Sequence, residues 1–220
     1  MKKTKISLIF NIIILALVVL ASYMMFAGVR FSSNQIVLES NNTSMFRFFT
    51  VDSNLLVGFA ALIMIVFDIR LLNNKIKTIP KWVYILKELA TLGVTITFLV
   101  TALFLGPTIS TGYLSLYTNS NLFFHLIVPV LSVISYICFE KYDNTYKDAL
   151  YGLIPVVLYS IYYVTMILTH LNNGLVDSNY DFYNFLNGDL NNAIFVLPIM
   201  FFVSYLTSLL LVYLNKKLLK

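Results

Sequence analysis

Charged residues are scarce in this chain. Asp, Glu, Lys and Arg make up 11% of its 220 residues, against roughly 25% in an ordinary soluble domain. Hydrophobic residues make up 59%. So few charged side chains cannot cover the surface of a water-soluble fold. The composition therefore excludes a typical soluble enzyme or binding domain and indicates an integral membrane protein.

Cysteine is almost absent as well. Cys138 is the single cysteine, which excludes an intrachain disulfide framework and a metal site built from several cysteines. We expect no metal site, no cofactor and no redox chemistry.

The sequence does contain six long apolar runs. Each has about 18–25 residues, and a helix that crosses a bilayer needs roughly 20. We therefore expect residues 1–220 to form one all-α membrane domain, a bundle of six transmembrane helices. The first run is longer than the apolar part of a signal peptide, so we interpret it as a retained span. The predicted spans are residues 6–27, 47–71, 83–105, 122–139, 150–170 and 193–214.

Positive charge is distributed unevenly, and this predicts the orientation. All but two of the 15 Lys and Arg residues fall on the side of the predicted bundle that holds both termini, the exceptions being Arg30 and Arg47. The predicted loops 106–121 and 171–192 contain neither residue type. Because cytoplasmic loops carry an excess of Lys and Arg, we expect both termini in the cytoplasm. The net charge of +5 is then a topological signal, and we expect no nucleic-acid partner.

Polar side chains inside the predicted spans are few, and such residues tend to face the interior of a bundle. On the second span, Thr50, Ser53 and Asn54 recur at helical spacing near the outer end. On the fourth span, His125 lies near the same boundary. At about 1.5 Å per residue, Thr50 and His125 should both lie roughly 5–6 Å below the outer surface. We therefore expect these two side chains to be able to meet.

A threonine hydroxyl becomes a nucleophile when a neighbouring imidazole accepts its proton. Thr50 and His125 are therefore the candidate catalytic pair. Asn54, one turn below Thr50, is a candidate oxyanion donor, with Ser53 or a backbone amide as alternatives. Asp52 projects from another face of the helix and is a candidate to cap the helix end or to orient His125. The same polar groups often only bond neighbouring helices to each other, and spacing leaves that interpretation open.

Two motifs resemble those of a known family. They are FFTVDSNLL at residues 48–56 and His125 followed by Pro129. Both are similar to the FT-x-x-SN-L-L and H-x-x-x-P motifs in bacterial relatives of the androgen-induced protein and androgen-dependent TFPI-regulating protein family of six-span membrane proteins. In eukaryotic members, a threonine and a histidine at these places form the catalytic pair of an intramembrane hydrolase that cleaves fatty-acid esters of hydroxy fatty acids. The resemblance implies that Thr50 is the nucleophile and His125 the base.

The expected setting is a bacterial cell membrane, because the composition rich in Lys, Asn and Ile is typical of a low-GC bacterium. Only the reaction class is carried over from the family, since the bacterial substrate can differ.

Three functions stay open from the sequence. The first is a cofactor-free hydrolase of lipid fatty-acyl esters taken from the surrounding membrane lipids. The second is an acyltransferase to another lipid, and the third is a non-enzymatic transporter or scaffold. Transporters carry polar groups near the midplane and broken helices, whereas the polar residues noted here lie near the outer face. Pro129, Pro155 and Pro198 are nevertheless able to kink three spans and open a cavity.

Geometry separates the enzyme from the other readings. A Thr50 hydroxyl more than about 6 Å from both ring nitrogens of His125 would count against catalysis. Substrate identity and oligomeric state are not determined by the sequence.

Overall fold

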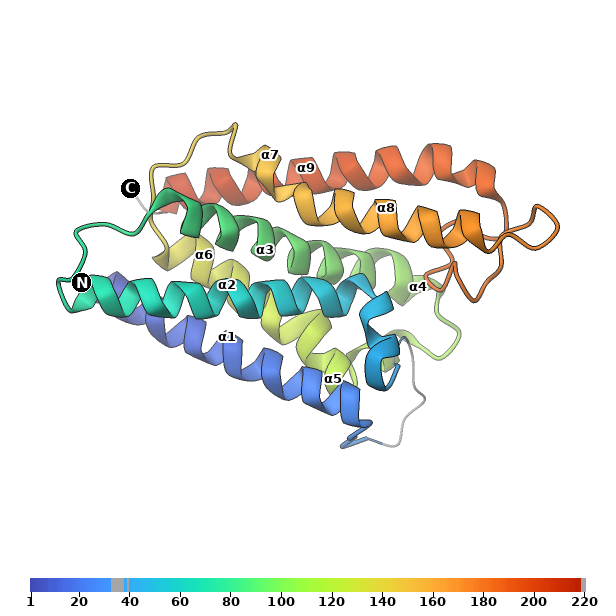
Figure 1. Ribbon diagram of the computed structural model, residues 1–220, viewed down its shortest axis with the longest axis horizontal. Helices are drawn as coiled ribbons and strands as arrows, with labels where there is room; N and C mark the ends of the chain where they lie inside the picture. The colour runs from blue at the N-terminus through green and yellow to red at the C-terminus, as the bar shows by residue number, and fades with distance from the viewer. Residues whose placement is uncertain (33–37, 39, 219–220) are drawn as a thin grey trace.

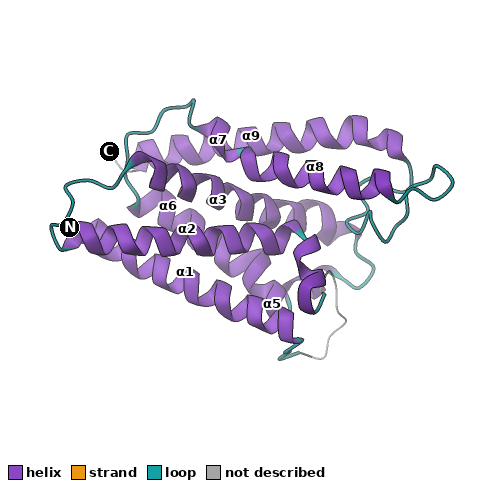
Figure 2. Cartoon of the chain, in the orientation of Figure 1, coloured by secondary structure: helices purple, strands orange, loops and turns teal. Residues whose placement is uncertain are grey.

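Six long apolar helical runs account for most of the chain in the computed structural model, which describes residues 1–32, 38 and 40–218 (Figures 1 and 2). Lys220, counted above among the positive residues, lies outside the described part. The six runs are long and apolar enough to cross a membrane, which confirms the predicted all-α fold and makes this a multi-pass integral membrane protein. They comprise Lys2–Ala27, Phe49–Leu72, Lys81–Thr108, Asn119–Phe139, Ala149–Thr169 and Leu190–Leu218.

Several of these runs are built from more than one helical element. The elements in chain order are α1 Lys2–Ala27, η1 Asn42–Arg47, α2 Phe49–Leu72, α3 Lys81–Leu99, η2 Val100–Leu105, α4 Gly106–Thr108, η3 Tyr113–Tyr117, α5 Asn119–Leu122, η4 Phe123–Ile127, α6 Val128–Phe139, α7 Ala149–Gly152, α8 Ile154–Thr169, η5 Leu190–Asn192 and α9 Ala193–Leu218.

Helix α2 begins at Phe49, two residues later than the predicted start of the second span at residue 47. The preceding η1 is a 3₁₀ helix, and Phe48 is extended, with φ −93° and ψ 127°. Thr50 is therefore in the first turn of α2. Its position near the end of a helix matters for the chemistry described below.

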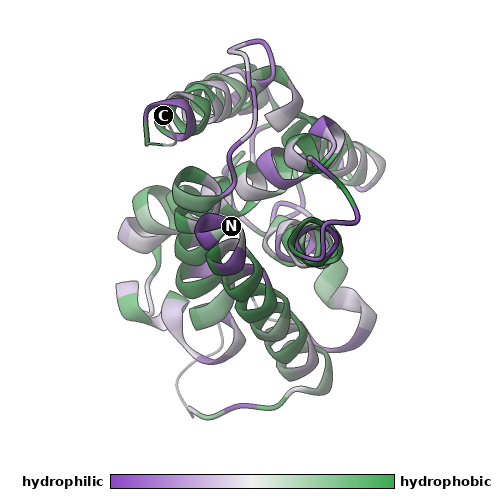
Figure 3. Cartoon of the chain, turned by 90° about the vertical axis from the view of Figure 1, so that its left-hand side faces the viewer, coloured by the Kyte–Doolittle hydropathy of each residue, from purple (hydrophilic) through white to green (hydrophobic). Residues whose placement is uncertain are grey.

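The start of α1 and the end of α9 lie at one end of the bundle, which we call the terminal end (Figure 1). The opposite end holds η1, η3 and the loop between α8 and η5. Figure 3, which views the terminal end, shows hydrophilic residues gathered at the chain ends and in the loops that connect largely hydrophobic helices. An even number of spans places both termini on one side. That this side is cytoplasmic stays a prediction from the charges.

Helix α3 lies at the centre of the bundle and packs against α2, α6, α7, α8 and α9. Helix α1 packs along α2, where a Cβ on Gly58 would lie 2.8 Å from Val18. A large apolar core cluster surrounds the opposite end and includes Phe48, Leu116 and Phe124. This core holds the start of α2 against the π-helical turn η4.

Candidate active site

The structure brings Thr50 and His125 together. Thr50 Oγ1 lies 3.5 Å from Nε2 of His125, although the two residues are 75 positions apart in the sequence. Both are buried, with 8% of Thr50 and 1% of His125 exposed. The distance is well inside the 6 Å limit set from the sequence and is within the range of loose contacts that catalytic pairs show without substrate.

A backbone carbonyl fixes which ring nitrogen of His125 carries hydrogen. Nδ1 lies 2.6 Å from the carbonyl oxygen of Leu116 in η3. A carbonyl oxygen can only accept a hydrogen bond, so Nδ1 must be the donor. In the neutral ring, Nε2 is then unprotonated and presents its lone pair to the Thr50 hydroxyl. The loop between the third and fourth spans therefore fixes the tautomer of His125 that can accept a proton at Nε2.

His125 lies in a widened helical turn, and Pro129 explains why. The turn η4 is a π-helix that joins α5 to α6. An α-helix would need the N–H of residue 129 to donate to the carbonyl of residue 125, but proline has no N–H and its ring clashes with that carbonyl. A π-helical turn accommodates the missing bond, and such turns are frequent at functional sites. The H-x-x-x-P spacing thus has a structural reason.

The amide of Asn54 is not available as an oxyanion donor. Its Nδ2 donates to the carbonyl of Thr50 at 2.7 Å and to that of Phe124 at 3.2 Å, which occupies both hydrogens. Asn54 therefore joins α2 to η4 beside Thr50 and His125.

The other two sequence candidates also point elsewhere. The Ser53 hydroxyl lies 2.9 Å from that of Thr97 on α3 and 3.2 Å from the Thr50 carbonyl. Asp52 lines a groove between α2 and α8. Nδ1 of His125, which Asp52 was a candidate to orient, donates instead to the Leu116 carbonyl. The structure thus places Ser53 in helix packing and Asp52 at the groove.

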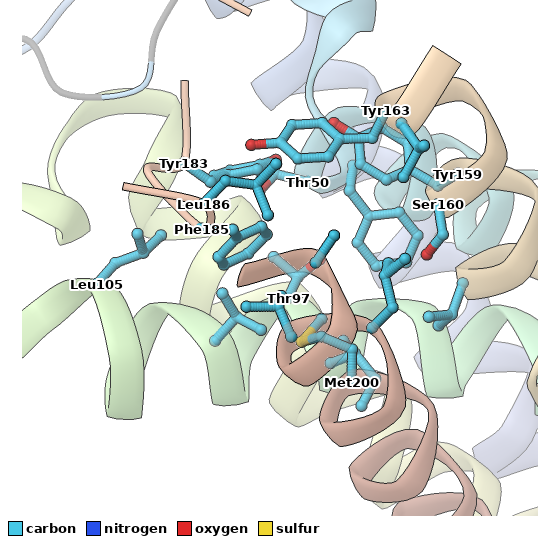
Figure 4. A pocket seen from close by; sticks show the side chains of 18 of the residues that line it. Thr50, Thr97, Leu105, Tyr159, Ser160, Tyr163, Tyr183, Phe185, Leu186 and Met200 are labelled. Atoms are coloured by element: carbon cyan, nitrogen blue, oxygen red, sulfur yellow. The ribbon is translucent and has the colours of Figure 1, made fainter. Parts of the chain in front are cut away.

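Thr50 opens on an apolar cavity of about 60 Å³. Figure 4 shows Tyr159, Tyr163 and Tyr183 gathered at the same side of the cavity as Thr50, and Thr97 and Met200 deeper in. The walls come from α2, α3, η2, α8, α9 and the loop that precedes η5. Besides Thr50, they include Phe49, Ile96, Thr97, Val100, Thr101, Leu105, Val156, Tyr159, Ser160, Tyr163, Val164, Ile167, Tyr183, Phe185, Leu186, Ala193, Val196, Leu197 and Met200.

Tyr183 is a site residue that the sequence did not reveal. Its hydroxyl is buried and makes no hydrogen bond of normal geometry within the described chain. Burial raises the pKa of Tyr183 to about 12. The Thr50 and Tyr159 hydroxyls and the backbone N–H groups of Phe49 and Thr50 lower this pKa by a smaller amount. At neutral pH the phenol is therefore protonated and able to donate to a group bound beside Thr50.

Asp181 fixes the loop that carries Tyr183. Its carboxylate accepts hydrogen bonds from the Tyr163 hydroxyl at 2.5 Å and from the backbone N–H groups of Phe185 and Leu186 at 2.9 Å each. The length of this loop was the one available signal, because loops longer than about 12–15 residues without regular structure are often functional.

A second hollow, of about 370 Å³, lies between α2 and α8. Phe49 and Tyr159 line both this groove and the cavity beside Thr50. Their ring centroids are 5.1 Å apart. The two rings therefore belong to the walls of both the groove and the cavity.

Comparison of the chain with protein-family models, curated proteins and solved structures gives no match. The resemblance to the androgen-induced protein family is therefore carried by the motifs at residues 48–56 and at His125 with Pro129. The family assignment stays a prediction.

Proposed function

We propose that this protein is an intramembrane hydrolase of lipid fatty-acyl esters, with Thr50 as nucleophile and His125 as general base. The observation that carries the proposal is the 3.5 Å approach of the Thr50 hydroxyl to Nε2 of His125, beside an apolar cavity. The motif resemblance supports the same roles. A scaffold would need neither the fixed tautomer of His125 nor a cavity beside the hydroxyl.

The 3.5 Å approach of Thr50 Oγ1 to His125 Nε2 supports the following acylation step. His125 Nε2 accepts the Thr50 hydroxyl proton while Oγ1 attacks the ester carbonyl carbon, which gives a tetrahedral oxyanion. When the intermediate collapses, the C–O bond to the alcohol breaks and the alcohol oxygen takes the proton from His125. The acyl group remains on Thr50 as an ester.

Deacylation repeats these steps with water. His125 takes a proton from the water while the water oxygen attacks the acyl carbon. When the bond between this carbon and Thr50 Oγ1 breaks, His125 returns the proton to Oγ1 and the fatty acid is released. The Leu116 carbonyl accepts the Nδ1 hydrogen throughout, so it stabilises the imidazolium formed in both halves of the reaction.

The oxyanion is expected to form at the N-terminus of α2. The first N–H groups of a helix have no partner within the helix, and the helix dipole favours negative charge there. The Tyr183 hydroxyl lies beside the N–H groups of Phe49 and Thr50. We assign oxyanion stabilisation to these two amides and the phenol, in place of Asn54.

The substrate is a lipid ester because the surroundings of Thr50 are apolar. The end of an acyl chain next to the ester would enter the cavity beside Thr50, and the larger groove between α2 and α8 would hold more of the chain toward the membrane. Leu158, on the groove, is 62% exposed on the outer surface of the bundle, where lipid chains lie.

Acyl transfer to a lipid hydroxyl is the second candidate. It uses the same acyl-threonine, and the groove that opens toward lipid favours it because a lipid alcohol can arrive by the same route as the substrate. The acceptor distinguishes the two reactions, so product analysis with and without an added lipid alcohol decides between them.

The first test is labelling of the purified protein by a lipophilic fluorophosphonate. We expect Thr50→Val to abolish labelling, because valine keeps the shape of threonine without its hydroxyl. His125→Ala should lower the labelling rate by about 10²- to 10⁴-fold, the usual contribution of a general base. Thr101→Ala, which also changes a threonine on the cavity wall, and His170→Ala are the matched controls.

Thermal stability measured in the same detergent confirms that each variant is folded. Labelling that persists in folded Thr50→Val would contradict the proposal and favour a transporter or scaffold.

A further inference from the structure

A second set of buried polar side chains lies at the terminal end of the bundle, far from Thr50 along α2 and α3. We call it the inner cluster. Its members come from α1, α2, α3, α6 and the residue that follows α6, and each is at most 1% exposed. They are Ser7, Asn11, Asp68, Lys87, Ser135 and Glu140. The proposed hydrolase uses none of them.

Lys87 is the cation of the inner cluster and is fully buried. Its Nζ donates to Asn11 Oδ1 at 2.5 Å and lies 3.6 Å from Glu140 Oε1. Charge compensation between close neighbours in the sequence would instead pair Arg70 with Asp68 and Lys87 with Glu88. Neighbouring residues on a helix do not face each other. Lys87 therefore pairs with Glu140, Arg70 lies over the Phe67 ring, and Glu88 accepts from the Tyr142 hydroxyl.

Hydrogen bonds link the two carboxylates of the inner cluster. The Ser7 hydroxyl donates to Asp68 Oδ2 at 2.8 Å. Glu140 Oε1 accepts from Ser135 at 2.6 Å and from Asn11 at 3.1 Å. Asn11 also approaches the Ser7 hydroxyl at 3.3 Å, so it bridges the two carboxyl groups. Glu140 Oε2 is buried and has no hydrogen-bond partner within the described residues.

The charges of the inner cluster do not balance if every group is ionised. Asp68 and Glu140 would contribute two negative charges against the one positive charge of Lys87. The Tyr84 phenol on α3 also lies near both carboxylates. Helix α1 contributes Ser7 and Asn11, and α9 contributes the Asn215 amide, which donates to the Glu140 carbonyl. An uncompensated carboxylate is very costly in a buried site, and protonation removes that cost.

We propose that the inner cluster is a proton-binding site, in which Asp68 and Glu140 together hold one exchangeable proton opposite the Lys87 ammonium. The proton adds to a carboxylate oxygen and forms an O–H bond, with no other bond changed. Because the carboxyl groups interact through Asn11, the proton belongs to the pair and not to either residue alone.

A proton suits this site better than a metal ion. The ammonium of Lys87 already lies between Asn11 and Glu140, where a metal ion would have to bind. The described chain contains no group of three or more His, Cys, Asp or Glu side chains placed to hold a metal. The inner cluster lies at the other end of the bundle from Thr50, so this inference is independent of the hydrolase.

Infrared difference spectroscopy of the protein in lipid nanodiscs tests the proposal. At neutral pH we expect a carbonyl stretching band from a protonated carboxyl group, which disappears at alkaline pH. Asp68→Asn and Glu140→Gln should each remove it, because one ionised carboxylate then pairs with Lys87. Lys87→Met should strengthen the band, because two carboxyl groups then lack a cation. Glu88→Gln, on the same helix but outside the inner cluster, should leave it unchanged.

Four outcomes would overturn the proposal. A wild-type spectrum without a protonated carboxyl band excludes it directly. A band that persists in folded Asp68→Asn and Glu140→Gln but is lost in Glu88→Gln belongs to Glu88. The spectra are also recorded with choline in place of sodium in the buffer. A band seen only with choline shows that sodium displaces the proton, so that the site binds a metal cation. If the inner-cluster variants do not fold, Asp52→Asn and Glu88→Gln serve as the test, because both remove a carboxyl group outside the inner cluster. The proposal requires the band to remain in both variants, and its loss in either one overturns the proposal.

Discussion

At the scale of single residues, the chemistry proposed at Thr50 depends on the groups that hold His125 in one tautomer. Nδ1 of the imidazole donates a hydrogen bond to the backbone carbonyl of Leu116, and Nε2 faces the Thr50 hydroxyl. In many hydrolases a carboxylate takes the first role. Here the Leu116 carbonyl does so, which supplies orientation without placing a full negative charge beside the ring. His125 is thus positioned by η3, a segment with no conspicuous polar motif.

The assignment of Tyr183 gives a prediction at this scale. Tyr183→Phe removes only the hydroxyl, so we expect turnover of a fluorogenic acyl ester to fall by about 10²- to 10³-fold, the usual loss for one oxyanion donor. Thermal stability should change little, because the hydroxyl makes no hydrogen bond of normal geometry with the described residues.

Tyr180→Phe is the matched control for Tyr183→Phe. Tyr180 belongs to the same loop, but its ring stacks on His170 and not beside Thr50. Turnover that is equal in the wild type and Tyr183→Phe would remove the phenol from the mechanism and leave the oxyanion to the amides of α2.

At the scale of secondary-structure elements, the site depends on helices that are not regular. The third span passes through the π-helical turn η2 and the fourth through η4. Leu105 of η2 lines the cavity, and His125 lies in η4. A regular α-helix advances about 100° per residue, so the extra residue in a π-helical turn changes the direction in which every later side chain points. The two π-helical turns therefore determine which side chains of the third span face the cavity and which side chain of the fourth span faces Thr50.

Pro129 tests this dependence. Pro129→Ala restores an N–H that can donate to the His125 carbonyl, so the turn is expected to close to α-helix and rotate His125 away from Thr50. We expect ester turnover to fall by at least an order of magnitude, as for loss of a general base, while thermal stability stays equal or rises.

Pro198→Ala, which removes the proline inside α9, is the control for Pro129→Ala. It should leave turnover near the wild-type value. Undiminished turnover in Pro129→Ala would show that the position of His125 does not depend on the π-helical turn.

At the scale of the whole molecule, polar chemistry is divided between the two ends of the bundle. The Thr50 and His125 pair lies at the opposite end, and the inner cluster at the terminal end, with α3 contributing residues to both. Between the two lies an apolar core in which Gly58 brings α1 and α2 close together. The two polar sites are therefore separated by tightly packed helices.

The distribution of Lys and Arg predicts that the terminal end faces the cytoplasm. Replacement of Cys138 by Ser gives a cysteine-free background for labelling of intact cells by a maleimide that cannot cross the membrane. Ser115→Cys, at the opposite end, should be labelled from outside. Lys75→Cys, in the loop after α2, should be labelled only after the membrane is permeabilised. The reverse result would place Thr50 toward the cytoplasm and contradict the predicted orientation.

The sequence by itself determined the six apolar spans and the all-α fold, and it predicted that Thr50 and His125 lie near the same end of the bundle. These properties follow from local hydropathy and helical rise, which depend on residues near each other in the chain. The structure then decided which groups these side chains meet. Asn54 bonds to the Phe124 carbonyl, 70 positions away, and Asn11 to Glu140, 129 positions away. The role of Tyr183 and the pairing of Lys87 likewise depend on how distant helices and loops pack. Hydropathy and periodicity carry no information about such contacts, because packing selects one partner among many residues at the same depth.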